Sequence, residues 1–324
     1  MIAGKIKINH LIFIASWQPI LSNKDSPVKA RIKKFIQSFL KNTLGIQIHR
    51  VKVKSSQAEK PKLKMRYEQD PAFSYMEDPV YQDRLMQELA QIGDSFRNKG
   101  SLPSYSDSSS LSIVKDFFRI YSSRKLTDNT HGSGFHNAFW LYFIARFFNP
   151  ELIVESGVWK GHSSWLLHQA CPEAEQYGFD ISLNKFEIPE LRSQMFQQDW
   201  GSFEFPSFNP DRALIFFDCH VNHAQRILEA KEKGFKHILF DDNPPIHKVY
   251  SHIPGIPTAA MLVANEGIDA TSINWVWNGE KVSRSIDPAQ AHQARDLIKV
   301  HEILPDVGGP TRYGGFAFLT YVQI

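Results

Sequence analysis

The chain has 324 residues, of which 42% are hydrophobic and 13% aromatic, and its formal net charge is +3. This length and apolar content suffice for a substantial hydrophobic core, which argues against wholesale disorder. No run approaches the roughly 18 apolar residues that a membrane-spanning helix requires. Two cysteines, Cys171 and Cys219, are too few for a disulfide framework or a zinc site, so we expect a cytoplasmic protein.

The positive charge is concentrated in an N-terminal arm, residues 1–66. Between Val28 and Arg66, twelve lysines and arginines stand against one acid, whereas the remaining chain carries 25 basic and 33 acidic residues. A domain that binds nucleic acid would present a basic face. The excess of acids outside the arm therefore argues against nucleic-acid binding by the rest of the chain.

One amphipathic helix is predicted within residues 28–54 of the arm. Apolar residues recur there at helical spacing among lysines and arginines, namely Ile32, Phe35, Ile36, Phe39 and Leu40. Such a helix either docks on the body or on a second copy of the chain, or lies on an anionic membrane surface. A homo-oligomer and a peripheral contact with the inner membrane face therefore both stay open.

Residues 67–127 are predicted to form a helical addition. Asp78 and Pro79 have the pattern of a helix N-cap and first residue, opening a helix that runs to about Phe96. A second helix is expected over residues 111–121. The polar, glycine-rich segment 128–134 then leads into a strongly apolar helix over residues 135–148, and this segment is either a lid over a ligand or an ordinary loop.

From residue 152 onward, short apolar runs alternate with amphipathic stretches. This alternation is typical of a parallel sheet covered by helices on both faces. The predicted strands are Leu152–Glu155, Gln176–Asp180, Gln194–Gln198, Ala213–Asp218 and His237–Asp241, and the predicted helices are Ser163–Gln169, Ile188–Arg192 and Asn222–Lys233. Two later runs, Ser272–Trp277 and Phe316–Val322, are interpreted as a terminal strand pair. The expected fold is therefore an α/β, doubly wound, mostly parallel, Rossmann-like sheet in residues 128–324, preceded by the helical addition.

In such sheets, ligands bind beyond the carboxyl ends of the strands. The first strand ends in the pattern Glu155-x-Gly157-x-x-x-Gly161, in which the glycines allow a tight turn and a close approach near the helix start. The helix that begins near Ser163 offers free N–H groups to a carboxylate. Asp180 ends the second strand and suits ribose hydroxyls.

The third strand is followed by Asp199 and Trp200, which suit the edge and the face of an adenine. This order of strand ends resembles that of class I methyltransferases, which bind S-adenosylmethionine (SAM). The resemblance covers roughly residues 128–324 and implies that the cofactor is held by Glu155, Gly157, Trp159, Gly161, Ser163, Asp180, Asp199 and Trp200. A domain that binds NAD is the alternative, but the turn lacks the G-x-G-x-x-G spacing of that class.

The fourth and fifth strands end in acids. Asp218 follows one strand, and the pair Asp241 and Asp242 follows the next. Three carboxylates at one point repel each other unless a cation or a proton lies among them, and oxygen ligands suit Mg²⁺. Two alternatives to a metal site require no ligand: Asp218 caps the following helix, and the segment that contains Asp241 and Asp242 is only a turn.

This arrangement of acids is similar to that of the Mg-dependent sugar O-methyltransferases (macrocin type) of macrolide and aminocoumarin pathways, and of the cephalosporin-hydroxylase family. In the sugar enzymes an acid that acts as base stands two residues after the fourth-strand Asp. His220 occupies that position here, and an imidazole can accept a proton at neutral pH. His223 is a second candidate base.

The resemblance implies divalent-metal-assisted methylation of a hydroxyl group on a sugar or small polyol-like metabolite, with Asp218, Asp241 and Asp242 as metal ligands. Two alternatives stay open. One is a metal-independent methyltransferase that acts on another acceptor, and the other is a non-catalytic binding or scaffold protein of the same fold.

Overall fold

The computed structural model describes residues 79–126, 129, 132–251, 255–311 and 318–324. These residues all belong to the second of two units into which the chain divides, Leu63–Ile324. The predictions for the arm, residues 1–66, and for the capping Asp78 lie outside the described residues.

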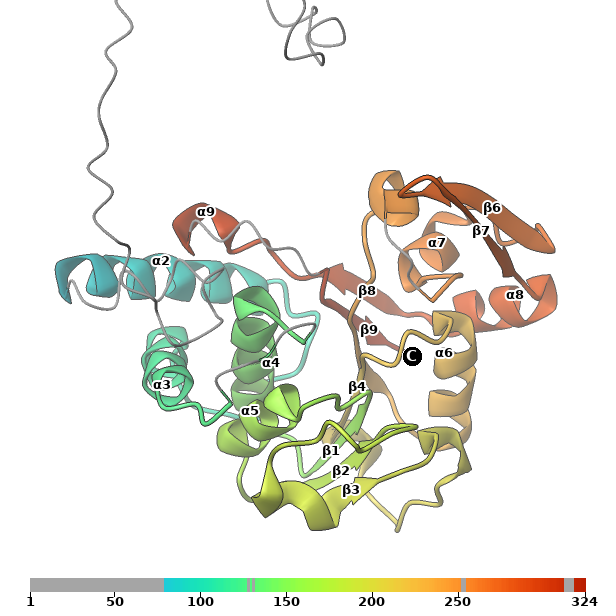
Figure 1. The fold of residues 1–324 in the computed structure, drawn as a ribbon. Helices are drawn as coiled ribbons and strands as arrows, with labels where there is room; N and C mark the ends of the chain where they lie inside the picture. Colours follow the sequence, from blue (N-terminus) through green and yellow to red (C-terminus); the bar gives the residue numbers. More distant parts are fainter. Residues whose placement is uncertain (1–78, 127–128, 130–131, 252–254, 312–317) are drawn as a thin grey trace, which may run out of the picture. The chain divides into compact units, whose positions relative to one another are not determined.

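A central seven-stranded sheet has the order β3-β2-β1-β4-β5-β9-β8 (Figure 1). All neighbouring strands from β3 to β5 are parallel, whereas β9 runs antiparallel to both β5 and β8. The strands are β1 Leu152–Ser156, β2 Glu175–Phe179, β3 Met195–Phe196, β4 Ala213–Phe217, β5 His237–Phe240, β8 Val300–Ile303 and β9 Thr320–Gln323. The order reverses between β1 and β4, as in a doubly wound sheet, so the predicted fold class is confirmed.

Helices cover both faces of this sheet because its central strands are apolar on both sides. Successive strand residues point to opposite faces, so Ile153 joins the core beneath α4 and α5, whereas Val154 joins the core beneath α6, α7 and α8. These helices are α4 Phe135–Phe148, α5 His162–Ala170, α6 His223–Glu232, α7 Ala259–Ala264 and α8 Pro288–Leu297, and Figure 1 shows the two groups on either side.

The helical addition contributes to the first of these cores. Helices α2 (Pro79–Arg97) and α3 (Ser110–Ser122) confirm the two predicted helices, and Ser109 caps α3 by accepting a hydrogen bond from the Ser112 backbone. Phe117 of α3 is fully buried, and its ring contacts those of Phe135 and Phe139 in α4. The aromatic side chains of α3 and α4 therefore share one hydrophobic cluster with the sheet.

The predicted pairing of the two late strands is wrong. Strand β6, Ser272–Trp277, pairs with β7, Glu280–Ser285, in a separate two-stranded sheet, whereas β9 completes the central sheet. The β6–β7 turn is Asn278-Gly279, with φ of 48° and 86°. Both values are positive, as a two-residue hairpin turn requires.

Two short elements between β2 and β4 also differ from the prediction. The expected helix over 188–192 is a 3₁₀ helix, η3 (Pro189–Gln194), and the expected strand over 194–198 is reduced to the two residues of β3. Single-turn 3₁₀ helices η4 (Trp200–Ser202) and η5 (Pro210–Arg212) follow, and η6 (Ile246–Ser251) and the short helix α9 (Gly308–Thr311) complete the described elements. The parallel strands still end within two residues of the positions that the sequence predicted.

Among the described helices, none combines the length and apolar character needed to cross a bilayer.

Candidate active site

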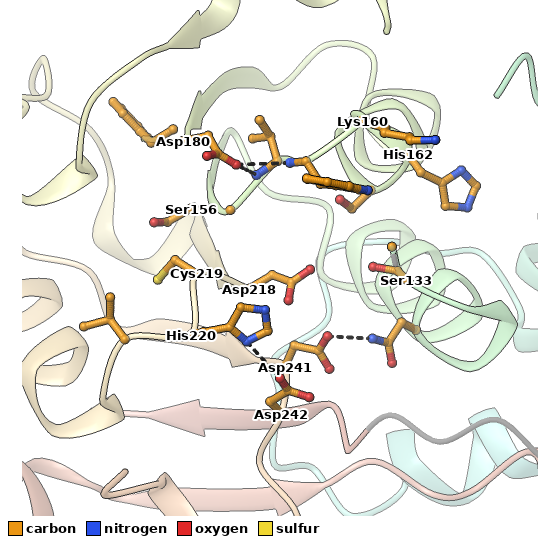
Figure 2. A pocket seen from close by; sticks show the side chains of 18 of the residues that line it. Ser133, Ser156, Lys160, His162, Asp180, Asp218, Cys219, His220, Asp241 and Asp242 are labelled. Carbon is orange, nitrogen blue, oxygen red and sulfur yellow. Dashed lines mark hydrogen bonds and ion pairs between the residues drawn. The ribbon is translucent and has the colours of Figure 1, made fainter. Parts of the chain in front are cut away.

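A cavity of about 810 Å³ lies at the carboxyl ends of the parallel strands (Figure 2). This volume falls in the range of about 300–1,000 Å³ that is typical of small-molecule sites. The cavity brings together residues from four strand ends, namely Gly157, Asp180, Asp218, His220, Asp241 and Asp242. The predicted convergence of strand ends on one crevice is therefore present.

Gly157 allows the ends of β1 and β4 to touch. Its φ is 95°, and a Cβ atom at this position would lie 2.5 Å from the backbone oxygen of Asp218. The backbone N–H of Gly157 donates to Phe179, and that of Asp218 donates to Ser156, each at 2.8 Å. The glycine is thus required by the positive φ and by the close approach of the neighbouring strand end.

Asp180 holds the turn that follows β1. Its Oδ2 accepts hydrogen bonds from the backbone N–H groups of Val158 at 3.1 Å and Trp159 at 3.2 Å, and its Oδ1 accepts one from Ser182 at 3.0 Å. Trp159 has a φ of 45°, is 39% exposed and lines the cavity beside Asp180. The carboxylate therefore fixes the backbone of the turn while facing the space where a ligand would lie.

Three predicted cofactor residues lie in β1 or at the start of α5, namely Glu155, Gly161 and Ser163, and of these only Ser163 lines the cavity. Gly161 precedes the helix with a φ of 91°, and a Cβ there would meet the ring of Phe186 at 2.6 Å, so it serves packing. Glu155 is fully buried under the helix, where the Ser164 hydroxyl donates to it. Burial raises the pKa of Glu155 to about 7.

Asp199 is paired with a buried arginine that the sequence analysis missed. The guanidinium of Arg226 donates to Asp199 Oδ1 at 3.0 Å and to Oδ2 at 2.6 Å, and it also contacts Glu229 at 2.7 Å. Hydrogen bonding to Arg226 holds the pKa of Asp199 below its usual range. Both residues line the cavity, but no local sequence pattern links two positions 27 residues apart.

Trp200 does not offer a face to a ligand, which corrects the prediction made for it. The side chain is completely buried, its ring packs against Phe217 and Phe235, and its Nε1 donates to Glu229 at 3.0 Å. The residue is absent from the cavity wall because its ring points into the core beneath α6.

The three predicted metal-binding acids come together at the ends of β4 and β5. Burial raises the pKa of Asp218 well above its usual value, and the charges of Asp241 and Asp242 raise it further. Burial likewise raises the pKa of Asp241 to about 6, although Asn137 Nδ2 donates to its Oδ2 at 3.0 Å. Figure 2 shows Asp218 and Asp241 side by side, with Asp242 turned toward His220.

The three acids do not form a complete metal site in this structure. Among the residues that the structure describes, no three His, Cys, Asp or Glu side chains are grouped as metal ligands would be. Asp241 Oδ1 is buried and has no hydrogen-bond partner within the described chain. The donor chemistry of Asp218 and Asp241 fits a hard cation, and Asp242 would have to leave His220 to complete the set.

The two candidate bases have different environments. His220 is largely exposed, has a φ of 54°, and places its Nδ1 2.9 Å from Asp242 Oδ2, which raises the pKa of the imidazole. His223 is buried, its ring stacks on Phe240, and its Nδ1 accepts from the Ala259 backbone at 3.1 Å. Burial lowers the pKa of His223 to about 3. Of the two, only His220 lines the main cavity.

Comparisons with known proteins add little to this geometry. No family model matches the chain, and no curated protein matches it. The chain is similar in structure to the SAH-bound methyltransferase PaMTH1 of Podospora anserina, with 14% identity over 71% of this chain and 92% of that chain and a TM-score of 0.36. A Bacillus cereus O-methyltransferase in complex with SAH has 12% identity over 66% of this chain and 91% of that chain, with a TM-score of 0.37.

TomG, an O-methyltransferase from Streptomyces achromogenes, has 15% identity over 62% of this chain and 99% of that chain, with a TM-score of 0.31. Superpositions with TM-scores this low do not bear on function. The fold assignment therefore rests on the strand order, and the chemistry rests on the cavity itself.

Proposed function

We propose that this chain is a SAM-dependent methyltransferase that methylates a hydroxyl group of a small, sugar-like or polyol-like metabolite. The observation that carries the proposal is that one cavity joins the Gly157 turn and Asp180 to the group formed by Asp218, His220 and Asp241. The first pair suits a nucleoside cofactor, and the second group suits proton removal from an acceptor.

The cofactor half of the cavity fits SAM in three respects. The backbone N–H groups at the N-terminus of α5, beside Ser163, can donate hydrogen bonds to the carboxylate of the methionine moiety. The Asp180 carboxylate accepts hydrogen bonds from backbone N–H groups and also lines the cavity, where it can accept hydrogen bonds from ribose hydroxyls. Asp199, held by Arg226, lines the same cavity and can accept from an adenine amino group.

The acid pair supports a divalent metal ion as an aid to the reaction. Burial raises the pKa values of both Asp218 and Asp241, and the neighbouring charge of Asp242 raises both further. A cation between them would replace this repulsion with attraction and favour the ionised form of both carboxyl groups. A bound Mg²⁺ or similar ion would supply Lewis acidity toward the acceptor oxygen.

His220 is the residue placed to remove the acceptor proton. Because its Nδ1 faces Asp242, we assign the Nδ1–H tautomer, which leaves Nε2 as the proton acceptor. SAM, when bound, would supply the methyl group of its sulfonium and would leave as SAH. His220 Nε2 would take the proton of the acceptor hydroxyl, and Asp242 would stabilise the resulting imidazolium.

A metal-independent methyltransferase is the second candidate. The contact between His220 Nδ1 and Asp242 Oδ2, at 2.9 Å, orients the imidazole without any cation and so favours a base that works without one. Methyl transfer that persists in EDTA would select this candidate, whereas loss on chelation and recovery with Mg²⁺ would select the metal-assisted one.

The His220→Ala variant tests the catalytic assignment. We expect its turnover to fall by about 10²- to 10⁴-fold, the usual contribution of a positioned base, while its affinity for SAH stays within about twofold. Calorimetric titration with SAH, with and without Mg²⁺, measures the binding half of this prediction independently of any acceptor. Equal losses of SAH affinity and turnover would refute the role of His220, and no SAH binding by the wild-type protein would refute the proposed function.

A further inference from the structure

The first turn of α4 carries two polar side chains in an otherwise apolar setting. His136 and Asn137 are 4% and 1% exposed, and both line the cavity. The other residues of the first three turns of α4 are alanine, leucine, isoleucine or aromatic, and all are buried. Packing alone would favour apolar residues at 136 and 137 as well, because a buried polar group without a partner costs about 1–3 kcal/mol.

Each of these side chains leaves one polar atom unsatisfied. Asn137 Nδ2 donates to Asp241, but Asn137 Oδ1 has no hydrogen-bond partner among the described residues. His136 Nε2 likewise has none in the described chain, and its Nδ1 lies 3.8 Å from Asp306, beyond hydrogen-bond distance. The hydrogen bond to Asp241 fixes the orientation of the Asn137 amide, so its oxygen is presented as an acceptor.

The surroundings define what could satisfy these atoms. Ser133 and Gly134 line the same wall, and Gly134, the N-cap of α4, provides no capping side chain. The Oδ1 atom of Asp241 is a further buried acceptor without a partner. Burial lowers the pKa of His136 to about 4, so its imidazole is neutral at physiological pH. A carboxylate or phosphate oxygen has no hydrogen to donate to Asn137 Oδ1. A neutral group with several hydroxyls can donate to one of these atoms and accept from another.

We propose that His136 and Asn137 form the acceptor subsite and select a neutral, polyhydroxylated acceptor through hydrogen bonds to its hydroxyl groups. This inference rests on the proposed function, since it assigns residues to the acceptor of that reaction. Both side chains line the cavity, so the hydroxyl groups of an acceptor bound there lie beside them. A site built to bond a hydroxyl group also rejects analogues that lack it, because its own polar atoms then stay unpaired.

The test compares the wild-type protein with His136→Phe and Asn137→Leu, which keep the approximate size of each side chain and remove its polar atoms. A matched control is His237→Phe, which removes a buried imidazole that is hydrogen-bonded to Tyr321. His237 lies at the amino-terminal end of β5, whereas the cavity lies at the carboxyl end. The probes are methyl pyranosides, the corresponding pyranosiduronates and cyclohexanol, with radiolabelled SAM as methyl donor. SAH affinity and thermal midpoint are measured for each variant.

We expect transfer to neutral pyranosides only, with the acceptor KM raised at least tenfold in both cavity variants and SAH affinity unchanged in all proteins. His136→Phe should also keep or raise the thermal midpoint, because it removes an unsatisfied buried group. Unchanged KM values in both cavity variants, transfer to the uronates as fast as to neutral pyranosides, or no transfer to any pyranoside would each overturn the subsite. If the wild-type protein does not bind SAH, the proposed function itself is refuted.

Discussion

Glu155 shows how a single buried carboxyl group can make stability depend on pH. Burial raises its pKa to about 7 from an ordinary value of 4.5, so the folded protein holds a proton that the unfolded chain releases. The contribution of Glu155 to the free energy of unfolding is therefore fully present below pH 4.5. It is lost progressively as the pH rises through the folded pKa.

Glu155→Gln removes this titration and keeps an oxygen that accepts from Ser164. We expect the variant to gain stability relative to wild type between pH 5 and pH 8, by up to roughly 3 kcal/mol. Urea unfolding of both proteins at the two pH values measures the gain. A difference between the proteins that is the same at both pH values would show that Glu155 does not titrate in this range.

The residues that sequence reasoning misplaced have a common physical cause. A strand end indicates which edge of the sheet a residue occupies, but not the direction in which its side chain points. Trp200 and His223 follow strand ends as predicted, yet the ring of Trp200 turns into the core and that of His223 stacks on Phe240. Arg226 was missed because its partner Asp199 is brought near only by the fold.

At the scale of elements, the contact between the ends of β1 and β4 depends on Gly157. An added methyl group would collide with the Asp218 backbone and require a φ of 95°, which L-residues rarely adopt. We expect Gly157→Ala to displace Asp218 and to lower both SAH affinity and turnover by at least tenfold. Calorimetry with SAH measures the first of these effects.

Gly279→Ala is the matched control, because Gly279 has a similar φ of 86° in the β6–β7 turn but nothing lies within 4 Å of its added Cβ. Both variants carry a backbone strain of order 1–3 kcal/mol, so both should unfold more readily. Only Gly157→Ala should lose SAH affinity. Equal loss in the two variants would mean that the collision with Asp218 has no bearing on the site.

The strands differ in how well the sequence predicted them, and the reason is their burial. β1, β4 and β5 are buried along their whole length, so their mostly apolar sequences gave nearly correct bounds. β7, with the sequence EKVSRS, is mostly exposed and β8, VHEI, is half-buried, so neither has a clear apolar pattern. The pairing of β6 could have been predicted from Asn278-Gly279, a strong hairpin signal. The insertion of β9 between β5 and β8 depends on tertiary packing.

At the scale of the whole molecule, the parallel direction of the first five strands followed from the sequence, and with it the position of the cavity. The boundary predicted between the helical addition, residues 67–127, and the domain 128–324 stays a prediction. The shared aromatic core of α3 and α4 indicates that the two fold together. Phe117 is the residue that tests this, since its ring meets those of Phe135, Phe139 and Tyr142 at centroid distances of 5.5–5.7 Å.

Phe117→Ala removes a fully buried ring and should lower the free energy of unfolding by about 3–5 kcal/mol. If α3 and α4 belong to one cooperative unit with the sheet, calorimetry will show the whole transition shifted to lower temperature and still coincident with loss of SAH binding. Val80→Ala on α2, where the side chain is 80% exposed, should shift the transition little. A Phe117→Ala protein in which helices melt early while SAH binding persists would show instead that the addition folds independently, as a separate domain.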